Sequence, residues 1–72
     1  MRLSYHPDTD SLYVELSEKS SVESREVSTG IVLDYDDDGN LVGIDIDNAS
    51  QKVRLDELVV RGLGAEGPRR AG

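Results

Sequence analysis

The sequence predicts an α+β domain that is mainly β. It consists of a four-stranded antiparallel meander followed by one or two short C-terminal helical segments, packed as a homodimer. Four stretches alternate apolar and polar residues, which is typical of half-buried strands, and turn-forming residues separate them. The chain has 72 residues and no cysteine. So short a chain builds a marginal core without disulfides, so we expect self-association to reinforce it.

The first two strands are predicted at residues 2–6 and 12–17. Leu3 and Tyr5 alternate with polar neighbours, and residues 7–11 read Pro-Asp-Thr-Asp-Ser. Proline lacks a backbone donor, and the Asp, Thr and Ser side chains bond to nearby backbone, so this stretch predicts a compact turn.

The third and fourth strands are predicted at residues 25–36 and 40–47, after a polar, exposed connection at residues 18–24. Gly30 interrupts the third strand, where we expect a bulge or a close approach of backbone. We predict no turn at this glycine, so residues 25–36 count as one strand.

The turn between the third and fourth strands is predicted as a two-residue type I′ turn at Asp38-Gly39. A three-residue loop at residues 37–39 would place Leu33 opposite Gly43, so the apolar pattern rejects it. The predicted pairs are Tyr35 with Val42, Leu33 with Ile44, and Ile31 with Ile46.

The two-residue alternation of apolar and polar residues ends after residue 47. Residues 48–52 predict one helical turn, and Asp56 is a candidate cap for a second short helix through residue 60. We therefore predict a single domain at residues 1–61, followed by a flexible Gly/Pro/Arg tail at residues 62–72.

Eleven apolar side chains are predicted to share one face of the sheet, and one short helix cannot cover them all. A sheet needs a second layer over such a face, and a second copy of the chain is the simplest source. We therefore expect a homodimer. The eleven residues are Leu3, Tyr5, Leu12, Val14, Leu16, Ile31, Leu33, Tyr35, Val42, Ile44 and Ile46.

The charge balance disfavours several classes of partner. Fifteen acidic and eight basic residues give a net charge of -7, which repels nucleic-acid phosphates and anionic lipids. The longest uninterrupted apolar stretch is residues 31–33, whereas a membrane helix needs about 20 residues. Met1 leads directly into patterned sequence without a signal peptide. We expect a cytoplasmic protein that binds neither nucleic acid nor membranes.

Five short sequence blocks, in the same order along the chain as in a known family, carry a resemblance to that family. They are residues 5–16, 30–36, 38–39, 42–46 and 49–50. Over residues 1–52 the chain resembles the short prokaryotic domain-of-unknown-function family 2283, in which Asp is more common at the position of His6. The resemblance implies a small β-rich fold with a short helix and no established activity. It also implies toxin-like or regulatory proteins as genomic neighbours.

Residues 34–45 match much of the EF-hand calcium loop, D-x-D-x-D-G with a carboxylate at position twelve. The candidate ligands are Asp34, Asp36, Asp38 and Asp45. Position twelve is Asp rather than Glu, and the preceding residues are strand-like rather than helical. We therefore favour a solvated acidic turn with no metal or cofactor. Binding of Ca²⁺ or another divalent cation is the alternative. A weaker version of it is non-specific cation binding by the carboxylates of Asp36, Asp37 and Asp38.

His6, Asp8 and Asp10 could form a metal site or an acid/base pair, but hydrolysis would also need a nucleophile and a cleft. The simpler interpretation is that Asp10 accepts backbone N–H groups and stabilises the turn. We therefore predict no catalytic residues and no enzyme. An enzyme that uses His6 and Asp10 is the third hypothesis.

The favoured function is a non-enzymatic, homodimeric interaction module. Tyr13 lies on the predicted second face with Glu15, and an amphipathic ring suits a partner surface. Equally, Tyr13 could pack across the sheet on Val32 or Leu41. The acidic surface favours a basic partner, such as a small regulatory or toxin-like protein, and addition of a strand at a sheet edge is a second mode. The candidate contacts are Tyr13, Glu15, Val32 and Leu41.

Overall fold

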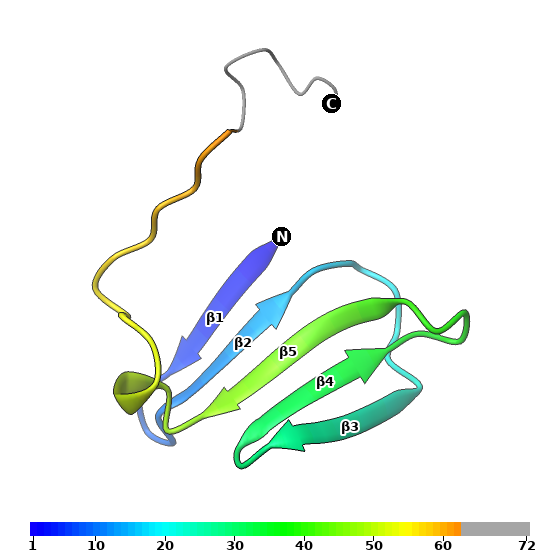
Figure 1. Ribbon diagram of the computed structural model, residues 1–72, viewed down its shortest axis with the longest axis horizontal. Coiled ribbons are helices and arrows are strands. Elements are labelled where there is room, and N and C mark those ends of the chain that lie inside the picture. The colour runs from blue at the N-terminus through cyan, green and yellow to red at the C-terminus, as the bar shows by residue number, and fades with distance from the viewer. Residues whose placement is uncertain (63–72) are drawn as a thin grey trace.

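The chain forms one five-stranded antiparallel sheet in a computed structural model that describes residues 1–62 (Figure 1). Along the sheet the order is β1-β2-β5-β4-β3. The predicted tail at residues 62–72 lies outside the described residues except for Gly62. The elements are β1 (Arg2–His6), β2 (Ser11–Glu15), β3 (Glu23–Ser28), β4 (Ile31–Tyr35), β5 (Leu41–Asp47) and the 3₁₀ turn η1 (Ala49–Gln51).

The predicted third strand is two strands, so the prediction of four strands is wrong. β3 and β4 are joined by a tight turn at Thr29 and Gly30, and Gly30 adopts a φ of 75° that favours glycine. The Lys52 ammonium donates to the carbonyl oxygens of Thr29 at 3.1 Å and Asp47 at 2.6 Å, which ties this turn to the end of β5. The chain therefore reverses where we expected only a bulge or a close approach.

The meander is also wrong, because the last strand lies in the middle of the sheet. β5 pairs with β2 on one side and β4 on the other, all antiparallel. The connection from β2 to β3 therefore passes the ends of β5 and β4 (Figure 1). It is fixed there by two backbone hydrogen bonds of 2.8 Å, from Leu16 N–H to the Val42 oxygen and from Val22 N–H to the Tyr35 oxygen.

The β4–β5 hairpin corrects the predicted turn but keeps most of the predicted register. Asp36 N–H donates to the Asn40 oxygen at 2.9 Å, which encloses a three-residue loop at residues 37–39. The register then shifts by one residue at Val42, so Tyr35 lies opposite Leu41. This bulge restores the two predicted pairs beyond it, Leu33 with Ile44 and Ile31 with Ile46.

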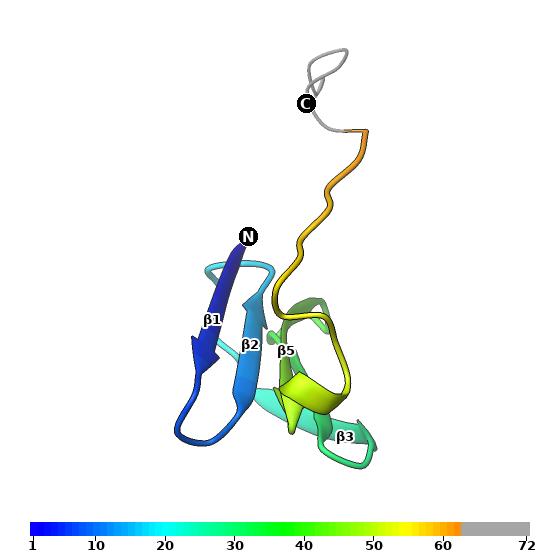
Figure 2. The same ribbon diagram turned by 90° about the vertical axis from the view of Figure 1, so that its left-hand side faces the viewer.

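The predicted C-terminal helices are absent from the described residues, which hold only the three-residue η1. Residues 53–62 form an irregular arm that leaves the sheet (Figure 2). A short helix needs tertiary packing to offset the cost of nucleation, and the residues of the predicted stripe, Leu55, Leu58 and Val59, all remain exposed. No described helix is long and apolar enough to span a membrane.

One sheet face, here called the apolar face, gathers most of the predicted apolar set. Val42 instead occupies the bulge, and Leu16 follows the end of β2. Cross-strand pairing places ten residues on this face: Leu3, Tyr5, Leu12, Val14, Ile31, Leu33, Tyr35, Leu41, Ile44 and Ile46.

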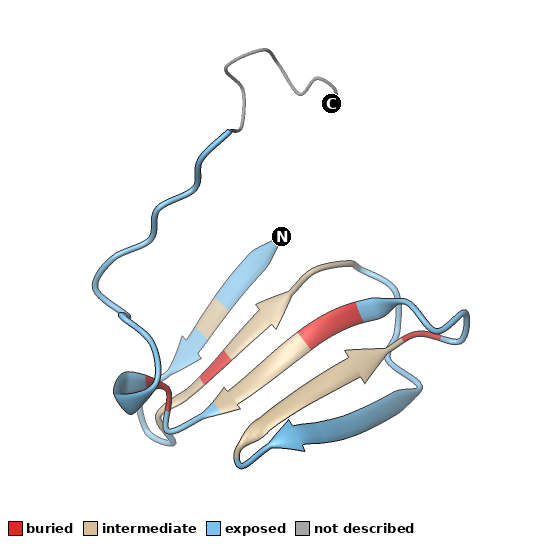
Figure 3. Ribbon diagram, in the orientation of Figure 1, coloured by how far each residue is buried: buried red, intermediate tan, exposed pale blue. Residues whose placement is uncertain are grey.

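Within residues 1–62 no second sheet or helix covers the apolar face, and most strand residues are half-buried or exposed (Figure 3). Among the described residues only Leu12, Val42 and Ala49 are buried hydrophobic residues, and no large side chain is below 2% exposure. The described part of the chain is therefore one open layer of sheet.

Candidate functional site

The opposite side of the sheet, here called the acidic face, carries five carboxylates. They come from strands β2 to β5 because alternate residues of a strand point to opposite sides. Arg2 and His6 of β1 lie at one edge of this face, and the Arg2 guanidinium lies 3.9 Å from the Glu15 carboxylate. The five acidic residues are Glu15, Glu26, Asp34, Asp45 and Asp47.

Tyr13 lies at the centre of the acidic face. Its hydroxyl donates to Oδ2 of Asp34 at 2.8 Å, and the Ser24 hydroxyl donates to Oδ1 of the same carboxylate at 2.6 Å. To reach Asp34 on β4 the ring crosses β5 at Gly43, where a Cβ atom would collide with the tyrosine hydroxyl. This chain of hydrogen bonds links β2, β4 and β3 over the surface of β5.

The Tyr13–Asp34–Ser24 bridge was not predicted from the sequence. The signal that could have found it is Gly43, the one residue without a side chain among the strand residues of this face. In the observed register Gly43 lies between Glu15 and Asp34, diagonally beside Tyr13. A glycine between an aromatic residue and a carboxylate leaves room for the ring.

The local electrostatics of the acidic face raise two pKa values. Burial, Asp34, Glu15 and Asp45 raise the pKa of Tyr13 to about 12. Burial raises the pKa of the Asp45 carboxyl, with further contributions from Asp47 and Asp34 and a small opposing one from His6. Burial makes the largest contribution to both shifts because it disfavours the charged form, and the neighbouring carboxylates add to it.

We expect a late tyrosine titration that depends on Gly43. In the wild type, tyrosinate absorbance should show one tyrosine ionising near pH 12, and Tyr13→Phe should remove that step. Gly43→Ala should push the ring off Asp34 and move the step toward 10, the ordinary value. Tyr35→Phe is the control and should leave the step in place. An unchanged step in Gly43→Ala would contradict the arrangement.

We expect Asp45→Asn to stabilise the protein at neutral pH by a few degrees in melting temperature. The folded state raises the pKa of Asp45, so the native protein holds this proton more firmly than the unfolded chain. Stability is therefore lost as pH rises through the folded-state pKa, and the amide avoids that loss. The difference from wild type should vanish well below pH 4, the ordinary range for Asp.

The control for Asp45→Asn is Asp37→Asn, which removes the same charge from an exposed turn residue. Its melting temperature should stay close to that of the wild type. An equal rise in both variants would show that net charge alone is responsible, and that the position of Asp45 on the acidic face has no special effect.

The structure places three of the four candidate partner contacts on the acidic face. Tyr13, Glu15 and Val32 share it, whereas Leu41 lies opposite Tyr35 on the apolar face because of the bulge at Val42. Tyr13 packs over Gly43 and is held by Asp34. Its hydroxyl is therefore already bonded, and the ring is a fixed part of the surface.

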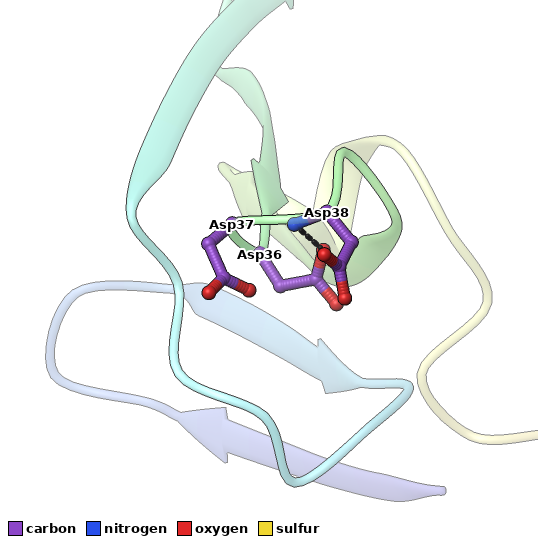
Figure 4. Close-up of side chains that lie close together, drawn as sticks. All are labelled: Asp36, Asp37 and Asp38. Atoms are coloured by element: carbon purple, nitrogen blue, oxygen red, sulfur yellow. Dashed lines mark hydrogen bonds between the residues drawn. The ribbon is translucent and has the colours of Figure 1, made fainter.

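The four candidate calcium ligands do not form one group. Among the described residues the carboxylates whose oxygens lie within 4.8 Å of one another are those of Asp36, Asp37 and Asp38 (Figure 4). Asp34 and Asp45 belong to the acidic face instead. The structure thus separates the loop positions that an EF-hand would bring to a common centre.

The Asp36 carboxylate is buried and holds the turn. Its Oδ1 accepts the N–H groups of Asp38 at 2.9 Å and Asn40 at 2.8 Å, and these bonds lower the pKa of the carboxyl. Asp38 is paired with the Lys19 ammonium at 3.3 Å. Two of the three clustered carboxylates therefore already have partners within the protein.

Asp10 has the structural role that the sequence predicted. It adopts a φ of 54°, and its carboxylate accepts Ser50 N–H at 3.0 Å, the Ser50 hydroxyl at 2.7 Å and the Tyr5 hydroxyl at 2.7 Å. These bonds lower the pKa of Asp10 and join the β1–β2 turn to η1. One surface hollow is lined by Met1, Glu15 and Leu16 and another by Leu3, Tyr5 and Leu55, and neither His6 nor Asp10 lines either of them.

The model of a family described as "Protein of unknown function (DUF2283)" matches residues 2–50. The chain belongs to the DUF2283 family. The matched segment contains the five described strands of this DUF2283 protein and most of η1, and it ends before the C-terminal arm. Comparison with curated proteins and with solved structures finds no match.

Proposed function

We propose that this DUF2283 protein is a non-enzymatic, homodimeric interaction module. The observation that carries the proposal is the open apolar face, ten residues on one side of a sheet that has no second layer. A contiguous apolar surface of this kind is a mark of protein interfaces, and two-fold packing of the same face on itself is its simplest cover.

In such a dimer the two acidic faces point outward, and each is suited to a basic protein partner. Five carboxylates lie on each face, and repulsion from Asp47 and Asp34 adds to the effect of burial in raising the pKa of Asp45. Lysine or arginine side chains would relieve that repulsion, which gives charge complementarity and faster association. Tyr13, Glu15 and Val32 are the proposed contacts, while Leu41 belongs to the dimer interface.

Light scattering over a range of micromolar concentrations tests the dimer. The expected molar mass is twice 7.9 kDa, with a melting temperature that rises with protein concentration. A folded monomer at every concentration would contradict the proposal. The basic partner should be retained on immobilised wild-type protein. It should not be retained on the immobilised double variant Glu15→Lys with Asp45→Lys, and added salt should weaken its retention on the wild type.

Cation binding at the turn is the second candidate, and the clustering of Asp36, Asp37 and Asp38 is the observation that favours it. It predicts that millimolar CaCl₂ raises the melting temperature by mass action, and that Asp36→Asn with Asp38→Asn abolishes the rise. If the interaction module is the whole function, CaCl₂ should act no more strongly than an equal ionic strength of NaCl.

A further inference from the structure

The two edges of the sheet differ in how they are protected against the addition of another strand. β1 pairs only with β2 and β3 only with β4, so the outer side of each has no neighbouring strand within residues 1–62. Natural sheets protect such edges with charged side chains, bulges or proline. β3 has a bulge at Val27 and three charged residues, Glu23, Arg25 and Glu26. β3 is therefore a protected edge.

β1 lacks this protection. It pairs with β2 in an unbroken register and contains no proline. Arg2 lies at the beginning of the strand, 3.9 Å from Glu15 of its neighbour. Leu3 and Tyr5 remain 45% and 41% exposed, although both lie on the apolar face. β1 is thus a regular edge strand with exposed apolar side chains, the kind of edge that accepts another strand.

An apolar groove lies beside β1 on the apolar face. In Figure 1 the C-terminal arm, residues 53–62, passes beside β1, and Figure 2 shows it displaced to one side of the sheet. A strand added at β1 would lie in the plane of the sheet, and its alternate side chains would point toward this groove. The groove has a volume of about 250 Å³, and its apolar lining residues are Leu3, Tyr5, Leu12, Val53, Leu55 and Leu58.

We infer that β1 pairs antiparallel with β1 of a second copy, so that two sheets join edge to edge. The register that uses the full length of both strands places Ser4 opposite Ser4 of the second copy, and Leu3 opposite Tyr5 of the second copy. Each copy thereby covers the exposed apolar side chains of the other with a cross-strand pair. Because the strand is its own complement in this register, a second copy satisfies the two-fold symmetry of an isologous interface.

This edge pairing goes beyond the proposed homodimer, which packs the apolar faces. Its two-fold axis is perpendicular to the sheet, so the joined sheets keep their apolar faces on one side, where face packing can still occur. Five residues from each copy make a small interface, and small interfaces are weak. We therefore expect the mass in light scattering to rise from two copies toward four in the millimolar range. A mass that stays at two copies throughout would contradict the edge pairing.

A symmetric disulfide tests the edge pairing directly, because the chain has no native cysteine. Residues directly opposite each other in an antiparallel pair have Cα atoms about 4.5–5.5 Å apart, which a disulfide can span. Full-length Ser4→Cys is reduced, transferred to a mild oxidant, and followed over time by non-reducing electrophoresis and mass spectrometry. The expected product is a covalent pair of chains joined at residue 4 of both copies.

The matched control is Ser24→Cys on β3, the protected edge. Ser24 lies on the same acidic face as Ser4 and is the more exposed of the two, so accessibility alone would favour its cross-link. Ser4→Cys should nevertheless cross-link several times faster. Equal rates, or a faster cross-link in Ser24→Cys, would overturn the edge pairing.

A second variant tests the register. Adding Leu3→Lys to Ser4→Cys places a charge opposite Tyr5 of the second copy, and a charge pointing into a sheet edge opposes strand addition. The cross-link should form several times more slowly than in Ser4→Cys alone. An unchanged rate would contradict the predicted pairing of Leu3 with Tyr5.

The same variants separate the edge pairing from the proposed homodimer. In the face-packed homodimer the acidic faces point outward on opposite sides, so the two Ser4 side chains cannot meet. If the wild type is a dimer and Ser4→Cys cross-links no faster than Ser24→Cys, the homodimer stands and the edge pairing is wrong. If the wild type is a folded monomer in the micromolar range but Ser4→Cys cross-links rapidly, the homodimer fails and the edge pairing stands.

Discussion

Leu33→Lys should abolish the dimer and unfold most of the protein at low concentration. Leu33 lies on β4 in the middle of the apolar face, between Ile44 on one side and Arg25 on the other. Leu33 is half-buried in one subunit and would be buried in the proposed dimer, where loss of a leucine costs about 3 kcal/mol, and a domain this small has about 3–5 kcal/mol in total. The substitution also places a charge at the centre of the proposed interface, so both the sheet and its second layer are weakened.

The matched control is Val32→Lys, the same change one residue earlier and on the other face. Val32 lies opposite Asp45 and Glu26, so the new ammonium has two carboxylates beside it, and the cost should be about 1 kcal/mol or less. Circular dichroism and light scattering at two concentrations measure both effects. If the two variants lose dimer and stability equally, the apolar face is not the interface.

Asp10→Ala should lower the melting temperature on the order of 10 °C. The variant loses the three hydrogen bonds that join Ser50 and Tyr5 to the turn, and alanine tolerates the φ of 54° less well than Asp or Asn. η1 would then be detached from the β1–β2 hairpin. Thermal melts followed by far-ultraviolet circular dichroism measure the effect.

Asp10→Asn separates the charge of Asp10 from its shape. Asparagine keeps the left-handed backbone and part of the hydrogen bonding. The melting temperature of Asp10→Asn should therefore lie between those of the wild type and Asp10→Ala. The folded state lowers the pKa of Asp10, so its stabilisation is complete above the unfolded value and is lost as pH falls below about 4. The asparagine variant should therefore lose less stability than wild type in acid. A steeper loss than in wild type would refute this role.

Much of the sheet could be predicted because alternation is a local signal. The positions of β1, β2 and β5 followed from it, and so did the pairs Leu33 with Ile44 and Ile31 with Ile46. The turn was wrong although these pairs were right, because a loop one residue longer and a bulge at Val42 cancel each other in register. A pattern that reads only side-chain faces cannot distinguish one two-residue turn from these two compensating irregularities.

The order of the strands in the sheet could not be predicted from local alternation. The pairing of β2 with β5 joins residues far apart in the chain, and alternation in either strand fits any neighbour. The turn at Thr29 and Gly30 was missed because a glycine in an apolar–polar pattern fits a bulge as well as a reversal. The helices were expected from spacing alone, but Leu58 and Val59 remain largely exposed, so packing does not offset the cost of forming a helix.

The candidate sites show the same difference: a site formed by a local motif could be predicted, and a site that depends on strand order could not. Asp10 was predicted to be structural from its place in a Pro-Asp-Thr-Asp-Ser turn, and its bond to the Ser50 N–H confirms this. The bridge from Tyr13 to Asp34 depends on strand order, since the ring crosses β5 to reach β4. No local motif contains it. Leu41 was assigned to the wrong face because the bulge at Val42 changes the alternation.

The central position of β5 also dictates how the chain can acquire its structure. β1–β2 and β3–β4 are adjacent hairpins that share no paired strand until the last strand enters between them. An isolated two-stranded hairpin is marginally stable in water. A nascent chain that ends before residue 41 thus holds two weak halves with open edges. The final strand converts them into one cooperative unit, so the chain must be synthesised through residue 47 before the inner edges of both hairpins are paired and protected from aggregation and proteolysis.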